Sequence, residues 1–504
     1  LMQVQEKDAG NTVTATITRT YDGLDRLMQE VTAQGTLTYT YDNASRRATM
    51  TVAGQPTVNY TYDNANRLIQ ITQGSSLVTI GYDDADRRAS LTLPNGNSLV
   101  YSYNAASELL SLTYKQGATV IGDLTYTYDL AGNRIKVGGT FARTTIPPAL
   151  TTASYNVNNQ QTVFGANTLT YDLNGNLATV TDTSGTATYS WNARNQLAAI
   201  TAPGFAASFS YDAFGRRTGK TVQGVTTNFV YDGLNPVQEK AGATVTANLL
   251  TGLGIDEFFQ RTDGVGSRAL LTDALGSTIA LGDSTGTLQT QYTYEPFGTT
   301  SATGVTSGNA FKYTGREDDG TGLYYYRARY YHPRLQRFIS EDPLGFGGGD
   351  VNLYGYVQGN PLTYVDPNGL AFKPGKTPPS RWPDPPSNVV GNDPKWNPEG
   401  YWEGKGDRRV SWDDRAHGAG VDRGIGPQDG HWDDASSDDR WDRSGRPLPY
   451  QGIEPCGGKG NCQTTVPSVV VTATGAYIVY RCIRMLPSLF PQFWWTIPGN
   501  FVTP

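Results

Sequence analysis

A short motif recurs between residues 10 and 300 and constrains the fold more than any other feature of the sequence. Each copy begins with Tyr-Asp, continues through a few residues rich in Gly, Ala and Asn, and ends with Arg and often Leu. The copies begin at Tyr21, Tyr41, Tyr62, Tyr82, Tyr128, Tyr171, Tyr211 and Tyr231, with degenerate copies at Tyr103 and Trp191. Most steps are 20 or 21 residues. A fixed period of this length is typical of repeat architectures, in which each copy is one structural unit.

The residues between the motifs alternate between Thr, Tyr and Val, as in GTLTYTYD at 35–42. Alternation at a period of two predicts strands with one buried face, and the Asp-to-Asn segment predicts a hairpin turn. One hairpin does not bury its apolar face alone, so the units are expected to stack. The Tyr and Leu of neighbouring units then form ladders, and Asp and Arg hold each turn by a charge-assisted hydrogen bond.

Composition supports a mainly β chain and excludes several functional classes. The 504 residues include 58 Gly and 31 Tyr, and the formal net charge of −6 gives no sign of a stable DNA complex. Cys456, Cys462 and Cys482 are too few for a disulfide framework and lack the histidine partners of a zinc site. Single Tyr-Asp pairs also suit carbohydrate-binding platforms, but their regular spacing favours a structural ladder.

The repeats end in a stretch of turns at 337–370, RFISEDPLGFGGGDVNLYGYVQGNPLTYVDPNGL. Gly, Pro, Asn and Asp are dense among aromatic residues there, which predicts a compact chain of turns. Two near-copies of one turn motif bracket the stretch, Asp342–Phe346 and Asp366–Leu370. We interpret this turn-rich core as the boundary between a β scaffold and a different C-terminal segment.

At this point the chain resembles the Rhs (YD-repeat) family. The resemblance continues through further motifs in the family's order: TDALGS at 272–277, YEPFG at 294–298, YTGRE at 313–317 and LYYYRARYYHPR at 323–334. It implies a β-hairpin shell, here a partial hollow cocoon, closed by a turn-rich core and followed by a C-terminal toxin. The expected domains are the repeat shell at 1–310, the core at 311–370, a Pro-rich linker at 371–398 and a toxin-like domain at 399–504.

The resemblance also implies that the chain cuts itself after the second turn motif, at the bond Leu370–Ala371. An aspartyl-type autoprotease needs one carboxylate as base and a second that carries a proton, since like charges held close separate their pKa values. The family pattern assigns these roles to Asp342 and Asp366, with Asp350 as second choice and Arg337 as the residue that shields or orients the pair. The alternative is that these Asp residues only cap turns.

The three histidines fall into two settings. His332 lies in a Tyr-Tyr-His-Pro-Arg turn, where a surface or packing role is favoured. His417 and His431 lie with Arg423 in a polar, Trp-rich segment, and such residues suit acid–base catalysis and phosphate binding in a metal-independent nuclease. His and Asp together could also bind a divalent metal ion, although their spacing matches no known metal-binding motif. The alternative is a small polar fold with a Trp core.

The tail 466–504 has no acidic residue, and its only charged side chains are Arg481 and Arg484. Uncharged runs flank this pair, but Pro487, Pro491 and Pro498 argue against one continuous membrane-spanning helix. An amphipathic or re-entrant membrane-active segment is one interpretation, and an apolar segment packed inside the shell is the other.

The resulting hypothesis is a polymorphic toxin used in interbacterial competition, with an effector that attacks RNA or the membrane of a target cell. It implies a cognate immunity protein and delivery by a secretion-apparatus spike or adaptor, as in type VI secretion. The N-terminal segment predicts no signal peptide and begins within a repeat, as a piece of a longer chain would. No cofactor is expected. The competing hypothesis is a non-toxic cell-surface, carbohydrate-binding or adhesion protein with YD repeats.

Overall fold

The computed structural model describes residues 2–7 and 11–371, together with the backbone of short strands between 373 and 441. The chain forms two compact units, Leu1–Ala153 with Thr162–Arg381, and Ser154–Gln161 with Trp382–Pro504. Antiparallel strands dominate the described residues, as the sequence predicted.

The repeats form two large sheets in which each strand pairs with its neighbours in the sequence. The first sheet has 13 strands: β1 (Gln3–Lys7), β2 (Val13–Tyr21), β3 (Leu27–Val31), β4 (Thr36–Tyr41), β5 (Arg47–Val52), β6 (Val58–Tyr62), β7 (Leu68–Gln73), β8 (Ser76–Tyr82), β9 (Arg88–Thr92), β10 (Asn97–Tyr103), β11 (Leu109–Gln116), β12 (Thr119–Tyr128) and β13 (Arg134–Gly138). The second sheet has 16 strands: β14 (Ala153–Tyr155), β15 (Gln161–Phe164), β16 (Asn167–Tyr171), β17 (Leu177–Asp182), β18 (Gly185–Trp191), β19 (Leu197–Ala202), β20 (Phe205–Tyr211), β21 (Arg217–Val222), β22 (Val225–Asp232), β23 (Asn235–Ala241), β24 (Thr244–Thr251), β25 (Phe258–Asp263), β26 (Gly266–Thr272), β27 (Thr278–Gly282), β28 (Leu288–Tyr294) and β29 (Thr300–Gly304).

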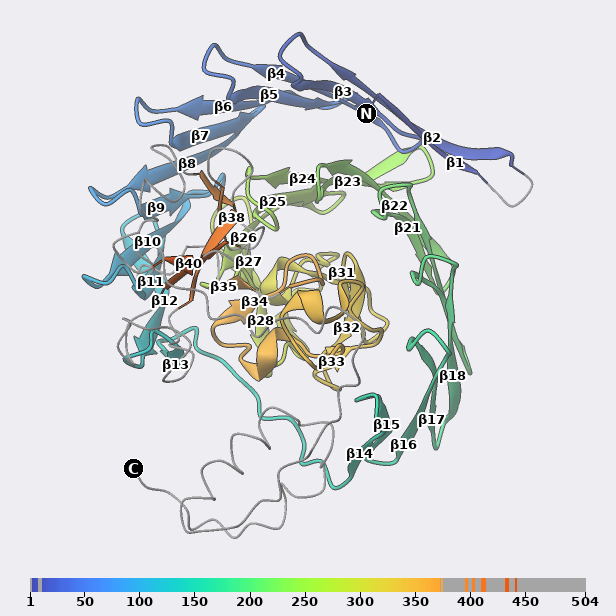
Figure 1. The fold of residues 1–504 in the computed structure, drawn as a ribbon. Helices are drawn as coiled ribbons and strands as arrows, with labels where there is room; N and C mark the ends of the chain where they lie inside the picture. Colours follow the sequence, from blue (N-terminus) through green and yellow to red (C-terminus); the bar gives the residue numbers. More distant parts are fainter. Residues whose placement is uncertain are drawn as a thin grey trace. The chain divides into compact units, whose positions relative to one another are not determined.

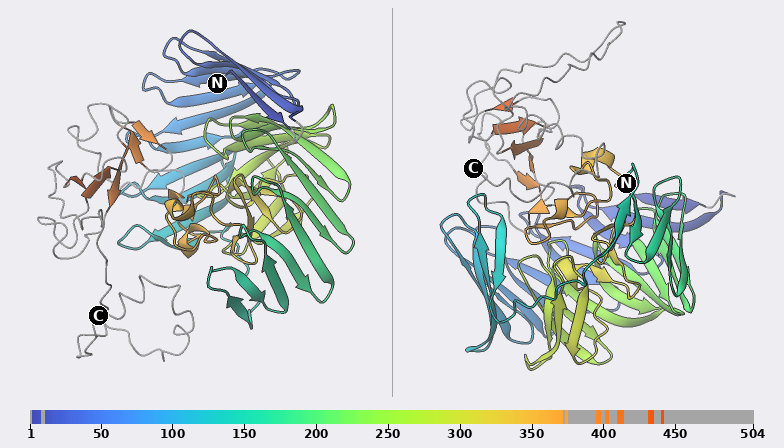
Figure 2. Two further views of the ribbon diagram at one scale, coloured as in Figure 1. Left: turned by 45° about the vertical axis from the view of Figure 1, so that its right-hand side comes forward. Right: turned by 90° about the horizontal axis from the view of Figure 1, so that it is seen from below.

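The turn-rich core follows the second sheet. It contains a four-stranded sheet of β30 (Glu317–Asp318), β31 (Tyr324–Tyr326), β32 (Arg329–His332) and β33 (Arg337–Phe338), and the hairpin of β34 (Tyr364–Val365) and β35 (Lys373–Pro374). The 3₁₀ turn η1 (Tyr313–Gly315) precedes β30, and two more, η2 (Gly345–Gly348) and η3 (Val357–Gly359), lie between β33 and β34. Figures 1 and 2 show the two large sheets curving around this core in the larger unit.

The smaller unit contains a five-stranded sheet. Its strands, in order, are β36 (Lys395–Asn397), β37 (Tyr401–Glu403), β38 (Arg409–Asp413), β39 (His431–Asp434) and β40 (Arg440–Trp441). The predicted tail at 466–504 lies outside the described residues.

The unit at Tyr62 shows how the repeat motif makes a turn. Asp63 Oδ1 accepts the backbone N–H groups of Ala65 and Arg67, each at 2.9 Å, and its Oδ2 accepts Arg67 Nε at 2.7 Å. The Arg67 guanidinium lies over the ring of Tyr82 in the next unit, 4.8 Å from its centroid. The Tyr82 hydroxyl donates to the carbonyl of Leu68 at 2.9 Å. Asp and Arg therefore hold the turn, and Arg and Tyr join it to the next one, which confirms the predicted ladder.

The first sheet and part of the second share one apolar core. It contains Ile71 and Tyr114 from the first sheet together with Leu250 and Leu271 from the second. Ion pairs cross between the sheets at Arg216–Glu30 (2.9 Å), Arg47–Asp232 (2.5 Å) and Arg88–Glu257 (2.7 Å). The sheets therefore pack face to face over part of their length, and the buried charges fix their alignment.

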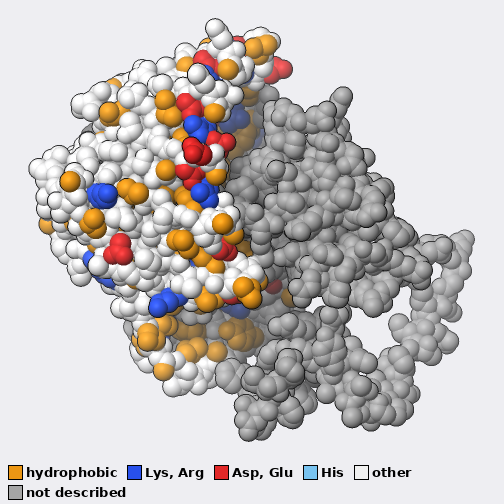
Figure 3. All heavy atoms as spheres, turned by 90° about the vertical axis from the view of Figure 1, so that its left-hand side faces the viewer, with side chains coloured by type: hydrophobic (Ala, Val, Ile, Leu, Met, Phe, Trp, Pro, Cys, Tyr) orange, Lys and Arg blue, Asp and Glu red, His pale blue; other side chains and the backbone are white. Residues whose placement is uncertain are grey.

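The outer surface carries charges of both signs. On the described part of the face drawn in Figure 3, acidic and basic side chains lie close together in a band, and most of the other described surface is uncharged. A mixed face of this kind does not create the one-signed field that draws in nucleic acid.

We expect Arg216→Ala to lower the free energy of unfolding by about 3–5 kcal/mol, because it leaves buried carboxylates without this partner. Arg216 is 7% exposed and pairs with Asp212 at 2.7 Å as well as with Glu30, which is 3% exposed. Urea unfolding of the full chain measures the change. Arg26→Ala is the matched control, since Arg26 makes the same turn contact with a side chain that is 25% exposed. Equal losses for the two variants would contradict the argument.

Candidate active site

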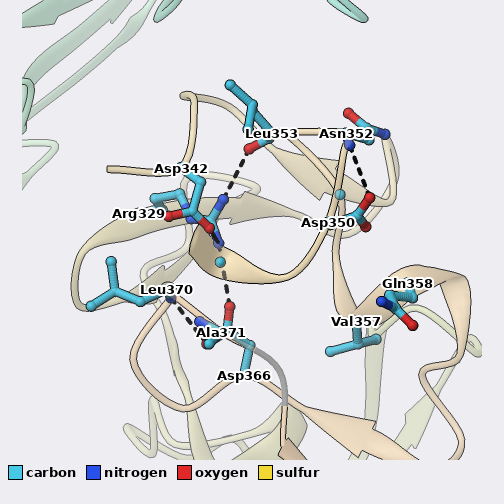
Figure 4. A pocket seen from close by; sticks show the side chains of 12 residues that line it. Arg329, Asp342, Asp350, Asn352, Leu353, Val357, Gln358, Asp366, Leu370 and Ala371 are labelled. Carbon is cyan, nitrogen blue, oxygen red and sulfur yellow. Dashed lines mark hydrogen bonds and ion pairs between the residues drawn. The ribbon is translucent and has the colours of Figure 1, made fainter. Parts of the chain in front are cut away.

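The two carboxylates chosen from the sequence lie in one small pocket of the turn-rich core. Asp342 follows β33, and Asp366 follows β34 at the start of the β34–β35 connection. The pocket is also lined by Arg329, Leu370 and Ala371 (Figure 4). The Leu370–Ala371 bond therefore lies beside both predicted acids.

Arg329 is the residue that joins the two carboxylates. Its Nη2 atom is 2.9 Å from Asp342 Oδ2 and 3.4 Å from Asp366 Oδ2. Its Nε donates to the carbonyl of Gly369 at 2.5 Å, and its Nη1 donates to that of Leu353 at 3.0 Å. Because Arg329 is only 3% exposed, these contacts hold its guanidinium in one place between the two acids.

Asp366 contacts the nitrogen of the predicted cleavage bond. Its Oδ1 atom accepts the backbone N–H of Leu370 at 3.1 Å and that of Ala371 at 3.2 Å. The side chain is 2% exposed, so little water competes with these hydrogen bonds. One oxygen of Asp366 therefore faces the nitrogen that would leave, and the other faces Arg329.

Asp342 lies on the carbonyl side of the same bond. A Cβ added to Gly348 would lie 2.5 Å from Asp342 Oδ2 and 2.9 Å from the carbonyl oxygen of Leu370. Both oxygens thus border the space that a side chain at position 348 would fill. Gly348 therefore keeps this space open between the acid and the carbonyl.

Both Asp residues also cap turns, so the two alternatives from the sequence coexist. Asp342 Oδ1 accepts the N–H of Leu344 at 2.8 Å while its Oδ2 faces Arg329. Each carboxylate thus uses one oxygen to hold its own loop and the other to contact the shared cation. The turn bonds orient the side chains for the site.

The electrostatics of the pocket favour one proton on the pair. Burial raises the pKa of Asp366, against the opposing effects of the Arg329 charge and of the two N–H groups it accepts. Burial likewise raises the pKa of Asp342, again opposed by Arg329. One guanidinium balances only one carboxylate in a poorly hydrated site, so the second Asp is favoured in its neutral form.

The arginine chosen from the sequence, Arg337, is not the one that the structure places between the acids. Arg337 lies in β33, is 7% exposed, and has its guanidinium 5.7 Å from the ring centroid of Tyr354. Arg329 takes the bridging position because the short β31–β32 hairpin directs it toward Asp366. Asp350 lines the far side of the pocket, where its Oδ1 accepts the N–H of Asn352 at 2.8 Å (Figure 4).

His332 has a packing role. Its Nδ1 accepts the N–H of Leu335 at 3.3 Å, and burial lowers the pKa of His332 to about 4. His417 and Arg423 lie outside the described residues, and for His431 only the strand backbone is described. Within residues 2–7 and 11–371, no cluster of His, Cys, Asp and Glu is suited to hold a metal ion. A search of the described residues also found no helix with the length and apolar character of a membrane span.

Two features of the site were missed from the sequence. Arg329 lies in an Arg- and Tyr-rich run, YYYRARYYHPR, in which no spacing rule singles out one arginine. The signal for Gly348 is the run Gly347–Gly349, which was interpreted only as a turn.

Comparisons with known proteins place this geometry in context. The Teneurin YD-shell family matches residues 3–122 and 97–361. A family described as a toxin with a conserved tryptophan and TIP tripeptide motif matches residues 439–504, which contain Trp495 followed by Thr496–Pro498.

Curated relatives match over short parts of their length. The toxin subunit YenC1 of Yersinia entomophaga is 42% identical over 102 residues, which are 19% of this chain and 10% of that protein. The probable deoxyribonuclease RhsB of Dickeya dadantii is 56% identical over 54 residues, 11% of this chain and 4% of that protein. The chain thus spans a tenth or less of the length of these relatives.

A solved structure of the Photorhabdus luminescens Tc holotoxin pore shares the fold. It superposes with a TM-score of 0.52 and 20% sequence identity, and the match covers 74% of this chain and 23% of that one. A match over 74% of the chain is long enough to include both the repeat sheets and the turn-rich core.

We expect His332→Gln to make the stability of the chain less dependent on pH between about 6.5 and 4. The folded pKa of His332 lies near 4, below the ordinary value of 6.5, so in this window the unfolded chain binds a proton that the folded chain does not. Stability conferred by neutral His332 is therefore lost as the pH falls. Thermal unfolding at several pH values, compared with the unsubstituted chain, measures the difference. Parallel pH profiles for the two chains would contradict it.

Proposed function

We propose that this chain, which belongs to the Teneurin YD-shell family, is an Rhs-type polymorphic toxin whose core cuts the Leu370–Ala371 bond and frees the C-terminal toxin segment. The observation that carries the proposal is the contact of Asp366 Oδ1 with the backbone nitrogen of Ala371, at 3.2 Å. Asp342 Oδ2 and the carbonyl oxygen of Leu370 border the same space beside Gly348, on the other side of this bond.

The proposed reaction uses the two acids in different protonation states. Asp342, the more exposed acid, takes a proton from a water molecule, whose oxygen attacks the carbonyl carbon of Leu370. The nitrogen of Ala371 then becomes tetrahedral, and protonated Asp366 donates its proton to that nitrogen as the C–N bond breaks. Asp342 gains a proton from water while Asp366 loses its own proton to the Ala371 nitrogen, so the pair carries one proton before and after the cut. The deeper burial of Asp366, which raises its pKa, supports its role as the proton donor.

Arg329 supports the reaction without exchanging a proton. Its charge offsets the ionised carboxylate in a buried site, and its Nε–H holds the Gly369 carbonyl, one residue before the bond that is cut. Fixing a peptide against its catalytic groups in this way removes much of the entropic part of the barrier.

We place the toxic activity within residues 439–504, the part that the toxin family matches. This segment contains none of the three histidines, since His417 and His431 both precede it. The match therefore supports the apolar tail as the active part, with the target-cell membrane as its first candidate target. The nuclease hypothesis, with His417, Arg423 and His431, is the alternative outcome.

The biological setting is part of the proposal. A self-cutting toxin of this kind is made in a bacterial cell, delivered into a competitor, and neutralised in its producer by a cognate immunity protein. A secretion spike or adaptor is the proposed delivery partner. RhsB and YenC1 are relatives described as a nuclease and a toxin subunit, and they support a toxin rather than an adhesion protein.

We expect Asp342→Asn and Asp366→Asn each to leave the 54.6 kDa chain uncut, because each removes one of the two proton-transfer groups. The loss is about 10²–10⁴-fold in rate, the usual contribution of general acid–base catalysis. A time course on a denaturing gel, with mass spectrometry of the new termini at Leu370 and Ala371, measures it. Asp350→Asn tests the second choice of acid: loss of cleavage in this variant would mean that Asp350 belongs to the catalytic pair. Release of the same fragment from both dyad variants would disprove the assignment.

We expect Trp495→Ala in the full chain to abolish the toxicity seen on expression in cells, whereas the double variant His417→Ala, His431→Ala stays toxic. The reason is that the matched toxin segment includes the tryptophan and excludes both histidines. Growth, membrane potential and RNA integrity are measured together. If RNA is degraded while the membrane potential stays intact, and the histidine variant no longer degrades RNA, the nuclease is favoured instead.

A further inference from the structure

A turn of the second large sheet reaches the core at Asp256. This residue lies between β24 and β25, is 4% exposed, and has a left-handed backbone with φ of 59°. Its own N–H donates to Asn235 Oδ1 at 2.9 Å. Asp256 is therefore a buried carboxylate in a fixed position on the second large sheet, which we call the wall, 60 and 71 residues before the core residues that it contacts.

Two arginines of the core converge on Asp256. Arg327 Nη2 is 2.7 Å from Asp256 Oδ1, and Arg327 Nη1 is 3.2 Å from Oδ2. Arg316 Nη1 forms an ion pair with Oδ1, while its Nε and Nη2 donate to the carbonyl of Tyr325 at 3.1 and 3.0 Å. The wall turn thus holds the middle of β31 through Arg316 and the residue after its end through Arg327.

Arg327 connects this anchor to the cleavage motif. It occupies the tip of the β31–β32 hairpin with φ of 61°. Its Nη1, which faces Asp256, also donates to the carbonyl of Pro367, and its Nη2 donates to that of Leu234 in another wall turn at 3.1 Å. One side chain therefore holds the wall and the Asp-Pro turn at the same time.

The next two residues of the hairpin, Ala328 and Arg329, also donate hydrogen bonds to this turn. Ala328 N–H donates to the carbonyl of Asn368 at 3.1 Å, and Arg329 Nε donates to that of Gly369 at 2.5 Å. Gly369 lies so close to the hairpin that an added Cβ would be 2.3 Å from the carbonyl oxygen of Tyr326. Three consecutive residues of the hairpin thus hold three consecutive carbonyls, up to the residue before Leu370.

We propose that Asp256 and Arg327 are positioning residues for self-cleavage, which set the Leu370–Ala371 bond against Asp342 and Asp366 only when the wall turn is seated on the core. The inference rests on the proposed self-cleavage and adds a condition to it. Because the carboxylate that orients Arg327 comes from the second sheet, the bond is aligned in the assembled shell and core and is misaligned in a core without its wall. Cleavage is therefore expected only in chains in which the second large sheet is packed on the core.

The test is the cleavage rate of Asp256→Asn in the full chain. We expect about a 10²-fold slower rate, the effect of a misplacement of about 1 Å at a reacting centre. The pH at which cleavage is half-maximal should not change, because the variant keeps the proton-transfer groups Asp342 and Asp366 and their charged neighbour Arg329. Arg327→Lys, which keeps the charge but not the two-pronged geometry, should be cut at an intermediate rate.

Asp319→Asn is the matched control. Asp319 is also a buried carboxylate that joins core and wall, through Arg217 Nη2 at 2.8 Å and Lys220 Nζ at 3.0 Å, and its side chain is 0% exposed. Asp256→Asn and Asp319→Asn should both lower the melting temperature, and only Asp256→Asn should slow cleavage. Resistance to limited proteolysis verifies that each variant is folded.

The outcomes separate this inference from the proposed function. An unsubstituted chain that stays uncut refutes the self-cleavage itself. If that chain is cut and both Asp256→Asn and Arg327→Lys match its rate, the positioning role is refuted while the dyad stands. Equal slowing by Asp319→Asn also refutes it, since stability alone would then explain the loss. If Asp256→Asn does not fold, the rate of Arg327→Lys decides.

Discussion

Most repeat turns depend on one aspartate that accepts hydrogen bonds from several donors at once, and the degenerate copies use Asn104 and Asn192 in its place. In the unit at Asp42, Oδ1 accepts two backbone N–H groups at 2.9 Å and Oδ2 accepts Arg46 Nε at 2.7 Å. Arg46 then lies 4.5 Å from the ring centroid of Tyr62 and reaches Asn66 Oδ1 at 2.8 Å, in the following turn. A turn is thus completed by contacts with the next unit, so each hairpin is stabilised by its neighbour and the sheet extends one unit at a time.

Such sheets would be free to slide over one another if only apolar faces met between them. The pairs Arg216–Glu30, Arg47–Asp232 and Arg88–Glu257 prevent this, because a shift by one residue would leave charges buried without partners. Burying these ions has a desolvation cost that offsets much of their attraction. Their main contribution is therefore alignment of the two sheets, and alignment is what delivers Asp256 and Leu234 to the core.

The sequence predicted what depends on local pattern. The hairpins, the Asp–Arg turns and the change of structure after the repeats follow from period and turn chemistry, and Asp342 and Asp366 followed from a family resemblance. Arg329 could not be predicted, because the choice between Arg329 and Arg337 depends on which strand of the folded core sheet faces the Asp-Pro turn. The role of Asp256 could not be predicted for the same reason, since the residues that it contacts are 60 and 71 positions away along the chain. Long-range pairing of this kind leaves no periodic signal.

The active-site geometry has a structural cost that the aromatic core offsets. Thr314, Arg327, Val357 and Gln358 adopt left-handed backbone conformations with φ between 45° and 61°, which are strained for residues other than glycine. Such strain persists only where the surroundings allow no alternative. Here Tyr326, Tyr331, Phe338 and Tyr356 are each at most 2% exposed and pack edge to face or tilted against one another. Val357 and Arg329 border both this cluster and the pocket. The same aromatic packing therefore stabilises the strained backbone and holds the two acids in position. A smaller side chain in this cluster would disorder the site before it unfolded the shell.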